Sequence, residues 1–306
     1  MANIIAVVWD FDKTLVDGYM QDPIFEYYGI NAHDFWTEVN ALPKKYKEEQ
    51  GVLVNPDTIY LNQFIRYAKS GKFKGLTNEK LKEFGEQLKF YKGVPEIFQK
   101  TKDLIEKNSI YQEYDIKVEH YIVSTGMSQI IRGSSVMPYV ENIWGCELIE
   151  GKDDAGDPCI SEIGFTIDNT TKTRALFEIN KGVNSKGREG VKVNTKIPEE
   201  LRRVHFINMI YVADGPSDIP AFSVVNKNAG ATFAIYPKGD MKAMKQVEQM
   251  RVEGRINMYA EADYTENTTA YMWICAKITE FAERIRSEEK QKIAKYAAFE
   301  GPKHII

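Results

Sequence analysis

The sequence predicts an α/β protein built on a doubly wound, mostly parallel sheet, with a second, smaller α-helical domain inserted near its start. Three short apolar segments predict the sheet, since each is rich in β-branched residues and ends in polar ones: residues 4–9, 118–123 and 209–213. The unbroken apolar run at residues 4–9 is typical of a strand in a parallel sheet covered by helices on both faces. A long stretch of helical periodicity after the first strand predicts the inserted domain.

The first apolar segment ends at two carboxylates, Asp10 and Asp12. Alternate side chains of an extended chain point the same way, so both can converge just beyond the strand. Open α/β sheets bind their ligands at that end of the strands. On this stretch alone, a strand that runs into an ordinary polar turn is the alternative, because Asp is common in turns.

The second region, residues 17–91, has the character of helices. Apolar and aromatic residues recur there at helical spacing, and turn residues interrupt them at residues 29–31, 42–43 and 70–72. We therefore expect a helical cap domain over residues 17–91 and a catalytic core over residues 1–16 and 92–306. Helices that simply cover the sheet are the alternative.

The α/β alternation then resumes to the end of the chain. Further strands are expected at residues 142–150 and 163–167, as a hairpin, and at 231–236. Helices are expected at residues 95–107, 128–132, 172–179, 219–225, 241–251 and 268–298. Residues 184–196 are rich in Gly, Lys and Asn and predict an exposed excursion, and the last helix is expected to pack on the sheet rather than to form a dimer seam.

Composition narrows the class of protein. The 306 residues carry a formal net charge of −4, which gives no electrostatic reason to expect nucleic acid or an anionic membrane as a partner. The three cysteines (Cys146, Cys159 and Cys275) are too scattered for a disulfide framework or a metal cluster. No apolar run approaches the roughly 20 residues of a membrane span. A cytoplasmic protein, monomeric or homodimeric, is expected.

Polar residues follow each of the three apolar strands. They are Asp10 and Asp12, then Ser124, Thr125 and Gly126, then Asp214 and Asp218, and Lys172 opens a helix between the last two groups. Adjacent parallel strands would bring these ends together. Clustered carboxylates need a cation, and oxygen ligands of this kind suit Mg²⁺. A hydroxyl with backbone N–H groups at a strand-to-helix turn can hold an anion such as phosphate.

These residues carry a resemblance to a known family. Asp10-Phe11-Asp12-Lys13-Thr14, followed by Ser124-Thr125-Gly126, Lys172 and Asp214-Gly215-Pro216-Ser217-Asp218, resembles the four ordered motifs of the haloacid dehalogenase-like (HAD) superfamily. The similarity is greatest to its phosphoserine-phosphatase-like branch, whose helical (C1-type) cap is inserted directly after the first motif. The interval from Lys172 to Asp214 is longer than expected for that branch, because of the excursion at residues 184–196.

The resemblance implies a role for each position. Asp10 would be the nucleophile that forms an aspartyl-phosphate, and Asp12 the acid and base. Lys172 would bridge Asp10 and phosphate, with Lys181 as a rival candidate at the other end of the same helix. Further roles are implied for phosphate binding (Ser124 with the amide of Thr125 or Gly126) and for Mg²⁺ binding (Asp10, Asp12 through its carbonyl, Asp214 and, in support, Asp218). For Asp218, a helix N-cap is the alternative.

The substrate is less defined. In phosphoserine phosphatases an acidic cap residue meets the substrate amine, and by spacing Tyr19 occupies that position here, beside Met20. Neither offers a countercharge for an ammonium group, which disfavours phosphoserine. Tyr19, Met20 and Phe25 are expected either to pack an apolar or ring-bearing leaving group or to belong to the core of the cap.

The leading hypothesis is a Mg²⁺-dependent phosphatase that hydrolyses a small phosphorylated metabolite. A phosphotransferase or mutase of the same superfamily is an alternative, and so is a non-catalytic protein that binds a phosphate ligand. The four histidines (His33, His120, His205 and His304) fall in no motif and are expected to be surface or core residues.

Overall fold

The computed structural model describes residues 3–299 and contains a seven-stranded sheet in the order β4-β3-β2-β1-β5-β6-β7. All neighbouring strands pair in parallel except β3 and β4, which form an antiparallel hairpin. The strands are β1 (Asn3–Trp9), β2 (Ile116–Met127), β3 (Val140–Lys152), β4 (Pro158–Phe165), β5 (Met209–Ala213), β6 (Ala231–Tyr236) and β7 (Met258–Glu261). The predicted α/β class with a mostly parallel sheet is confirmed.

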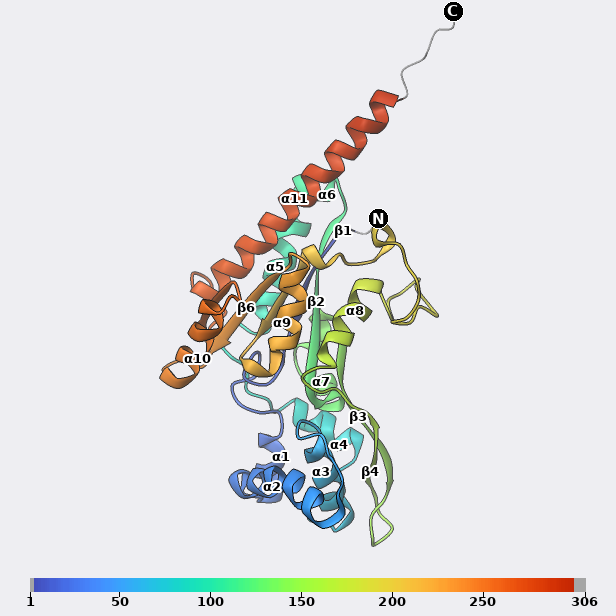
Figure 1. Ribbon diagram of the computed structural model, residues 1–306, viewed down its shortest axis with the longest axis vertical. Helices are drawn as coiled ribbons and strands as arrows, with labels where there is room; N and C mark the ends of the chain where they lie inside the picture. Colours follow the sequence, from blue (N-terminus) through green and yellow to red (C-terminus); the bar gives the residue numbers. More distant parts are fainter. Residues whose placement is uncertain (1–2, 300–306) are drawn as a thin grey trace, which may run out of the picture.

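Helices cover both faces of the sheet (Figure 1). They are α1 (Asp22–Tyr28), α2 (Ala32–Gln50), α3 (Ile59–Lys69), α4 (Asn78–Gly85), α5 (Glu96–Glu106), α6 (Ser109–Gln112), α7 (Ser128–Gly133), α8 (Lys172–Lys181), α9 (Ile219–Lys227), α10 (Met241–Val252) and α11 (Thr269–Phe299). On one face, Val7 and Trp9 of β1 share a hydrophobic cluster with residues of α5 and α11. On the other face, Ala6 and Val8 share a second cluster with residues of α8, α9 and α10. Side chains of one strand alternate between the two faces, so β1 is buried on both.

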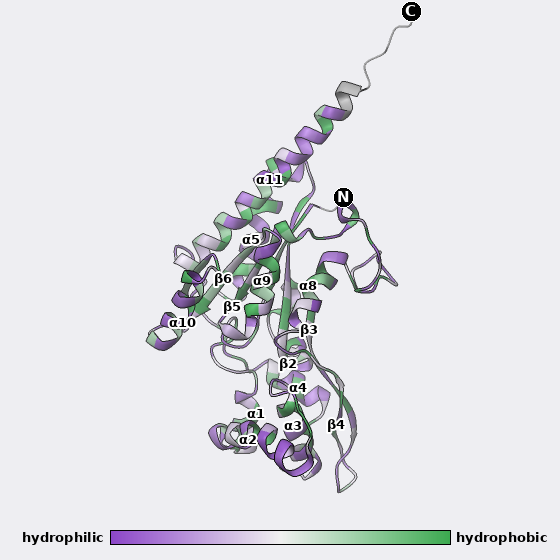
Figure 2. Ribbon diagram, viewed as in Figure 1, coloured by the Kyte–Doolittle hydropathy of each residue, from purple (hydrophilic) through white to green (hydrophobic). Residues whose placement is uncertain are grey.

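The helices α1–α4 lie together beyond the carboxyl ends of β1 and β2 (Figure 1). The β3–β4 hairpin runs alongside them, and the backbone N–H of Ile160 on β4 donates to the carbonyl of Leu76, which precedes α4. Hydrophobic residues of this block, such as Phe35 and Phe64, join the same cluster as those of β1 and α5. The block is green inside and purple on its outer side in the hydropathy view (Figure 2).

The helix α11 follows the predicted pattern. It contacts β1, β2 and β7 as well as α5, so the expectation that it packs on the sheet is confirmed. Its buried residues are Ala270, Ile274, Ile278, Phe281, Ala282 and Ile285. Its later part extends well past the core (Figure 1). None of the helices within residues 3–299 is long and apolar enough to cross a membrane.

Three details differ from the prediction. Residues 42–43 do not interrupt the chain, because Pro43 lies inside α2. The last strand of the hairpin begins at Pro158 and ends at Phe165, earlier than residues 163–167. The edge strand β7 was not predicted, since its apolar run is only three residues long (residues 258–260). Residues 184–196 contain neither helix nor strand, as expected for an excursion.

Candidate active site

The carboxyl ends of β1, β2 and β5 meet at one edge of the sheet, because these strands are parallel neighbours. Asp10 directly follows β1, and its backbone N–H donates to the carbonyl of Val212 on β5 at 2.9 Å. The chain then turns sharply: Lys13 has a φ of +55°, and the N–H groups of Leu15 and Val16 both donate to the carbonyl of Phe11. This turn holds Asp10 and Asp12 at the carboxyl edge of the sheet.

Lys172 lies at the centre of the site. Its Nζ is 2.7 Å from Oδ1 of Asp10 and 2.7 Å from Oδ1 of Asp218, and its side chain is 2% exposed. Burial alone would lower the pKa of this ammonium, but the two carboxylates outweigh burial and raise it. Lys172 is therefore a buried, permanently charged cation between two acids.

The rival Lys181 lies elsewhere. Its Nζ donates to the carbonyls of Val193 and Thr195, so it holds the excursion at residues 184–196 against the end of α8. Gly182, in a left-handed conformation with a φ of +77°, ends the helix there. The structure thus brings Lys172, and not Lys181, to the carboxylates.

Three carboxylates gather around this cation. One oxygen each from Asp10, Asp214 and Asp218 lies within 4.8 Å of the others. Burial, followed by the charges of Asp10 and Asp218, raises the pKa of Asp214 to about 7. Burial also raises the pKa of Asp10 to about 6, although the ammonium of Lys172 acts in the opposite direction. The mutual repulsion of these groups and their hard oxygen donors fit a Mg²⁺ ion.

Asp218 is fully buried and accepts hydrogen bonds from Lys172, from the hydroxyl of Tyr211 at 2.6 Å and from that of Ser217 at 2.9 Å. Its side chain makes no capping hydrogen bond to α9. The alternative that Asp218 serves only as a helix N-cap is therefore wrong.

Asp12 lines the same cavity as Asp10 and Lys172. Its Oδ1 accepts from the backbone N–H of Met20 at 2.8 Å. Burial, and secondly the charge of Asp10, raises the pKa of Asp12 well above its ordinary value. A raised pKa favours the protonated form of the carboxyl group, which is the form that a general acid requires. Thr14 supports the other acid, since its hydroxyl donates to Oδ2 of Asp10 at 3.1 Å.

The opposite wall is the turn at residues 124–126, which lies within β2, where the pairing with β3 is interrupted between Val123 and Met127. The strand predicted at residues 118–123 therefore does not end before Ser124. Ser124 is 2% exposed, and its Oγ accepts from the backbone N–H of Gly126 at 2.9 Å. A cavity of about 170 Å³ lies between the turn and the acids and is lined by Asp10, Asp12, Lys13, Tyr19, Ser124, Thr125, Lys172, Asp214 and Ser217. Of the three residues expected to bind phosphate, Ser124 and Thr125 line this cavity, whereas Gly126 contributes its backbone to the turn behind it.

Tyr19 and Met20 separate in the structure. Tyr19 is 40% exposed and lines the cavity, with the ammonium of Lys13 4.4 Å from the centre of its ring. Met20 is fully buried, and its Sδ lies 3.1 Å from the backbone nitrogen of Met127. Phe25 is buried as well, so for Met20 and Phe25 the structure favours the core over a substrate contact.

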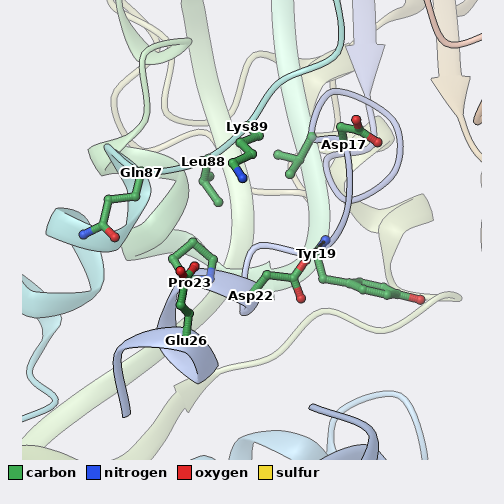
Figure 3. Close-up of a pocket in the computed structure, with 9 residues that line it drawn as sticks. Asp17, Tyr19, Asp22, Pro23, Glu26, Gln87, Leu88 and Lys89 are labelled. Carbon is green, nitrogen blue, oxygen red and sulfur yellow. Dashed lines mark hydrogen bonds between the residues drawn. The ribbon is translucent and has the colours of Figure 1, made fainter. Parts of the chain in front are cut away.

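A second cavity, of about 210 Å³, opens on the other side of Tyr19. Its lining includes Asp17, Asp22 and Glu26 from the loop after the first motif and from α1, and Lys89 from the return to the core (Figure 3). Figure 3 shows the Tyr19 ring pointing away from Asp22 and Glu26. Tyr19 is thus the residue shared by the two cavities.

Several residues of the site were not singled out from the sequence. Lys13 belongs to the first motif, and Tyr60 and Tyr211 lie in segments whose apolar pattern predicts a helix and a strand. The hydroxyl of Tyr60 donates to the carbonyl of Thr125 at 2.8 Å. A tyrosine in an otherwise apolar segment is a weak signal of a buried hydroxyl that needs an acceptor. Among the histidines, His120 is a core residue and His33 is exposed, whereas His304 lies outside the described residues.

Comparison with known proteins gives one full-length relative. No protein-family model matches the sequence. An uncharacterized protein of Borreliella burgdorferi (strain ATCC 35210 / DSM 4680 / CIP 102532 / B31) is 36% identical over 289 residues, which cover 90% of this chain and 97% of the relative. The chain belongs to the same family as this protein.

Solved structures resemble the chain more distantly. A HAD family hydrolase from Salmonella enterica subsp. enterica serovar Typhi is 14% identical, with 84% of this chain and 67% of that chain covered and a TM-score of 0.48. A phosphoserine phosphatase in its apo form is 15% identical over 83% of this chain and 92% of that chain, with a TM-score of 0.48. Cytosolic 5′-nucleotidase IIIB bound to cytidine is 14% identical over 94% of this chain and 88% of that chain, with a TM-score of 0.45. Because these structural similarities are distant, function is inferred from the side chains of the site.

Proposed function

We propose that the chain is a phosphohydrolase of the HAD superfamily that cleaves a small phosphomonoester with Mg²⁺ as cofactor. The observation that carries the proposal is the buried Lys172 between Asp10 and Asp218, with Asp214 beside them and Ser124 across the cavity. These five residues come from four segments of the chain: the end of β1, the end of β2, the start of α8 and the loop after β5. The segments follow one another in the order that the HAD motifs have along the chain. Such an arrangement suits the transfer of a phosphoryl group, where positioning and charge stabilisation dominate.

The chemistry follows from the positions of the side chains. Oδ2 of Asp10 accepts a hydrogen bond from Thr14 and Oδ1 accepts one from Lys172, so the carboxylate is held in one orientation for attack on phosphorus. The attack forms an aspartyl-phosphate and releases the alcohol, to which Asp12 gives its proton. Asp12 then removes a proton from the water that hydrolyses this intermediate. Lys172 and the hydroxyl of Ser124 stabilise the phosphoryl oxygens.

Asp10 and Asp214 would hold the Mg²⁺ ion, together with the backbone carbonyl of Asp12, and Asp218 would support it. When bound, the ion neutralises charge on the carboxylates and on the phosphoryl group. Residues 17–91 would act as the cap that closes over the cavity, since they supply Tyr19 at its mouth. The substrate would be a small phosphorylated metabolite whose leaving group lies against Tyr19.

The test is a phosphate-release assay over a panel of phosphorylated metabolites and p-nitrophenyl phosphate, with Mg²⁺ present. We expect turnover by the wild type and none by Asp10→Asn, which keeps the size of the side chain but removes the nucleophile. Asp154→Asn, in the exposed turn of the β3–β4 hairpin, should keep full activity. Phosphate release by Asp10→Asn at the wild-type rate would exclude the covalent mechanism. Formation of a new phosphate ester in the presence of an added acceptor alcohol would reveal phosphoryl transfer in place of hydrolysis.

A further inference from the structure

One peptide group of the phosphate-binding turn is held at both of its polar atoms. The carbonyl of Thr125 and the N–H of Gly126 belong to the same planar unit. The carbonyl accepts from the hydroxyl of Tyr60 at 2.8 Å, and the N–H donates to Oγ of Ser124 at 2.9 Å. A rotation of this peptide group would break both hydrogen bonds at once.

The hydrogen bond to Gly126 determines what Ser124 can do. Oγ of Ser124 is the acceptor in that bond, so its own proton is left to donate elsewhere. Ser124 lines the cavity that also holds Asp10 and Lys172. The fixed peptide group therefore keeps one hydroxyl donor available for a phosphoryl oxygen.

Tyr60 belongs to the helical block formed by α1–α4 and not to the sheet. It lies on α3, in the helical block, and is 5% exposed. Its ring packs against Trp36 and Phe64, with centroid distances of 5.8 and 6.0 Å, and this packing immobilises the hydroxyl. Among side chains, the thiol of Cys146 also donates to the carbonyl of Thr125 at 3.3 Å, but a thiol is a weak donor.

We propose that Tyr60 is a positioning residue through which the helical block orients the phosphate-binding turn. The proposal rests on the proposed function, because it concerns the same site. Tyr60 acts through the Thr125–Gly126 peptide on Ser124 and touches neither substrate nor metal. Without its hydroxyl the carbonyl of Thr125 loses its strongest side-chain donor, so the peptide group and the hydrogen bond that orients Ser124 are held less firmly. The helical block thereby contributes to phosphate binding as well as to covering the cavity.

The test compares Tyr60→Phe with Tyr67→Phe. Both residues lie on α3, and the hydroxyl of Tyr67 donates to Oε2 of Glu38 at 2.7 Å, within the helical block and away from the site. Both variants keep the ring and lose one buried hydrogen bond, so they should lower the melting temperature to a similar extent. The inhibition constant of inorganic phosphate should rise about tenfold for Tyr60→Phe, the worth of one hydrogen bond, and stay within about twofold for Tyr67→Phe.

The double variant Tyr60→Phe/Ser124→Ala tests whether Tyr60 acts through Ser124. If Tyr60 acts through Ser124, the Tyr60→Phe change should have little further effect on phosphate inhibition in the Ser124→Ala background. Unchanged phosphate inhibition in Tyr60→Phe, equal weakening in Tyr67→Phe, or full additivity with Ser124→Ala would each overturn the inference. These outcomes leave the proposed function standing, whereas a wild type that neither hydrolyses phosphomonoesters nor is inhibited by phosphate would overturn both.

Discussion

At the scale of single residues, the site is organised by one buried cation. Lys172 contacts two buried carboxylates, and a charge in such a place is stable only when it is paired. Lys181, on the same helix, contacts two exposed-loop carbonyls instead. The two lysines thus contribute differently to stability, although they lie on the same helix only nine positions apart.

We predict that Lys172→Met abolishes phosphate release and lowers the free energy of unfolding by about 3 kcal/mol or more, because it leaves Asp10 and Asp218 buried without their cation. Lys181→Met is the matched control and should keep both activity and most of the stability. Phosphate release and urea unfolding of the two variants would measure this. Equal effects of the two changes would contradict the role given to Lys172.

A second buried titratable residue, His120, lies far from the chemistry. Nε1 of Trp9 donates to its Nδ1 at 3.1 Å, so the ring proton is on Nε2, which faces Oγ1 of Thr101 and the carbonyl of Phe98. Burial, and secondly the charge of Lys102, lowers the pKa of His120 to about 3. The ring is therefore neutral in the folded protein over the whole physiological range.

This burial predicts a dependence of stability on pH. Between pH 6.5 and about 3 the unfolded chain binds a proton at His120 that the folded chain does not, so stability falls as the pH falls through this window. From pH 7 to pH 5 the loss due to this group should be about 2 kcal/mol. His120→Gln should remove that slope, measured by urea unfolding at both pH values, while the exposed His33→Gln should retain it. A parallel pH response of wild type and His120→Gln would refute the assignment.

At the residue scale, the sequence could predict which charged residues lie together at the edge of the sheet. It could not predict which neighbouring side chains face the cavity, because packing alone determines that. Asp10, Asp12, Lys172, Asp214 and Asp218 lie together because they follow strands or begin a helix at one edge of the sheet. By contrast, nothing in the sequence separates Tyr19, which lines the cavity, from Met20, which is buried beside Gly126. Which side of the backbone faces the cavity depends on the turn at Lys13, and that turn is a tertiary feature.

At the scale of elements, apolar strands were the most predictable. The bounds predicted for β5 and β6 are those of the structure, since both are continuous apolar runs buried on two faces. Pro43 misled the prediction, because the helix α2 continues through it despite the missing backbone donor. The close approach of α4 and α7 could not be predicted either, as it depends on two glycines that are far apart in the sequence.

These glycines, Gly85 on α4 and Gly133 on α7, make the contact between helical block and core. A Cβ atom at Gly133 would lie 1.9 Å from the carbonyl oxygen of Lys82, and one at Gly85 would lie 2.1 Å from that of Ile130. Both clashes are with backbone, which cannot move aside as a side chain would. The two helices are therefore held at a distance that only glycine permits.

We predict that Gly133→Ala destabilises the protein by about 3 kcal/mol, because overpacking against backbone forces the helices apart. Gly164→Ala on β4 is the control, since its nearest contact is a side-chain atom of Ile149 at 3.2 Å that can shift. Denaturant midpoints of the two variants would decide. Equal losses of stability in the two variants would contradict a close backbone contact between α4 and α7.

At the scale of the whole molecule, one hydrophobic cluster runs from the helical block into the sheet. The block is tied further by Asn55, whose Nδ2 donates to Asp168 at 2.8 Å, and by Asp57, which accepts from the backbone N–H of Asn169. Asp168 begins the turn that leads into Lys172 and α8. A motion of residues 17–91 away from the cavity would therefore break contacts with the turn that leads into Lys172.

The proposed Mg²⁺ site would link the stability of the molecule to a divalent cation. Oxygens of Asp10, Asp214 and Asp218 lie within 4.8 Å of one another, and Lys172 pairs with Asp10 and Asp218 only, so the charge of Asp214 adds a repulsion that opposes folding. A ligand that binds only the folded chain stabilises it by about 2.7 kcal/mol at a concentration 100 times its dissociation constant. We predict that Mg²⁺ raises the melting temperature of the wild type and that EDTA reverses the effect and stops phosphate release.

The variant Asp214→Asn tests whether repulsion between the carboxylates destabilises the protein without metal. In EDTA it should melt at a higher temperature than the wild type, because one of the repelling charges is gone, yet Mg²⁺ should stabilise it far less. Asp154→Asn, on the exposed hairpin turn, should behave as the wild type in both conditions. A calorimetric scan of the three proteins with and without Mg²⁺ measures both effects. If Asp214→Asn were less stable than the wild type in EDTA and equally responsive to Mg²⁺, the carboxylates would be held by hydrogen bonds alone and the metal site would have to lie elsewhere.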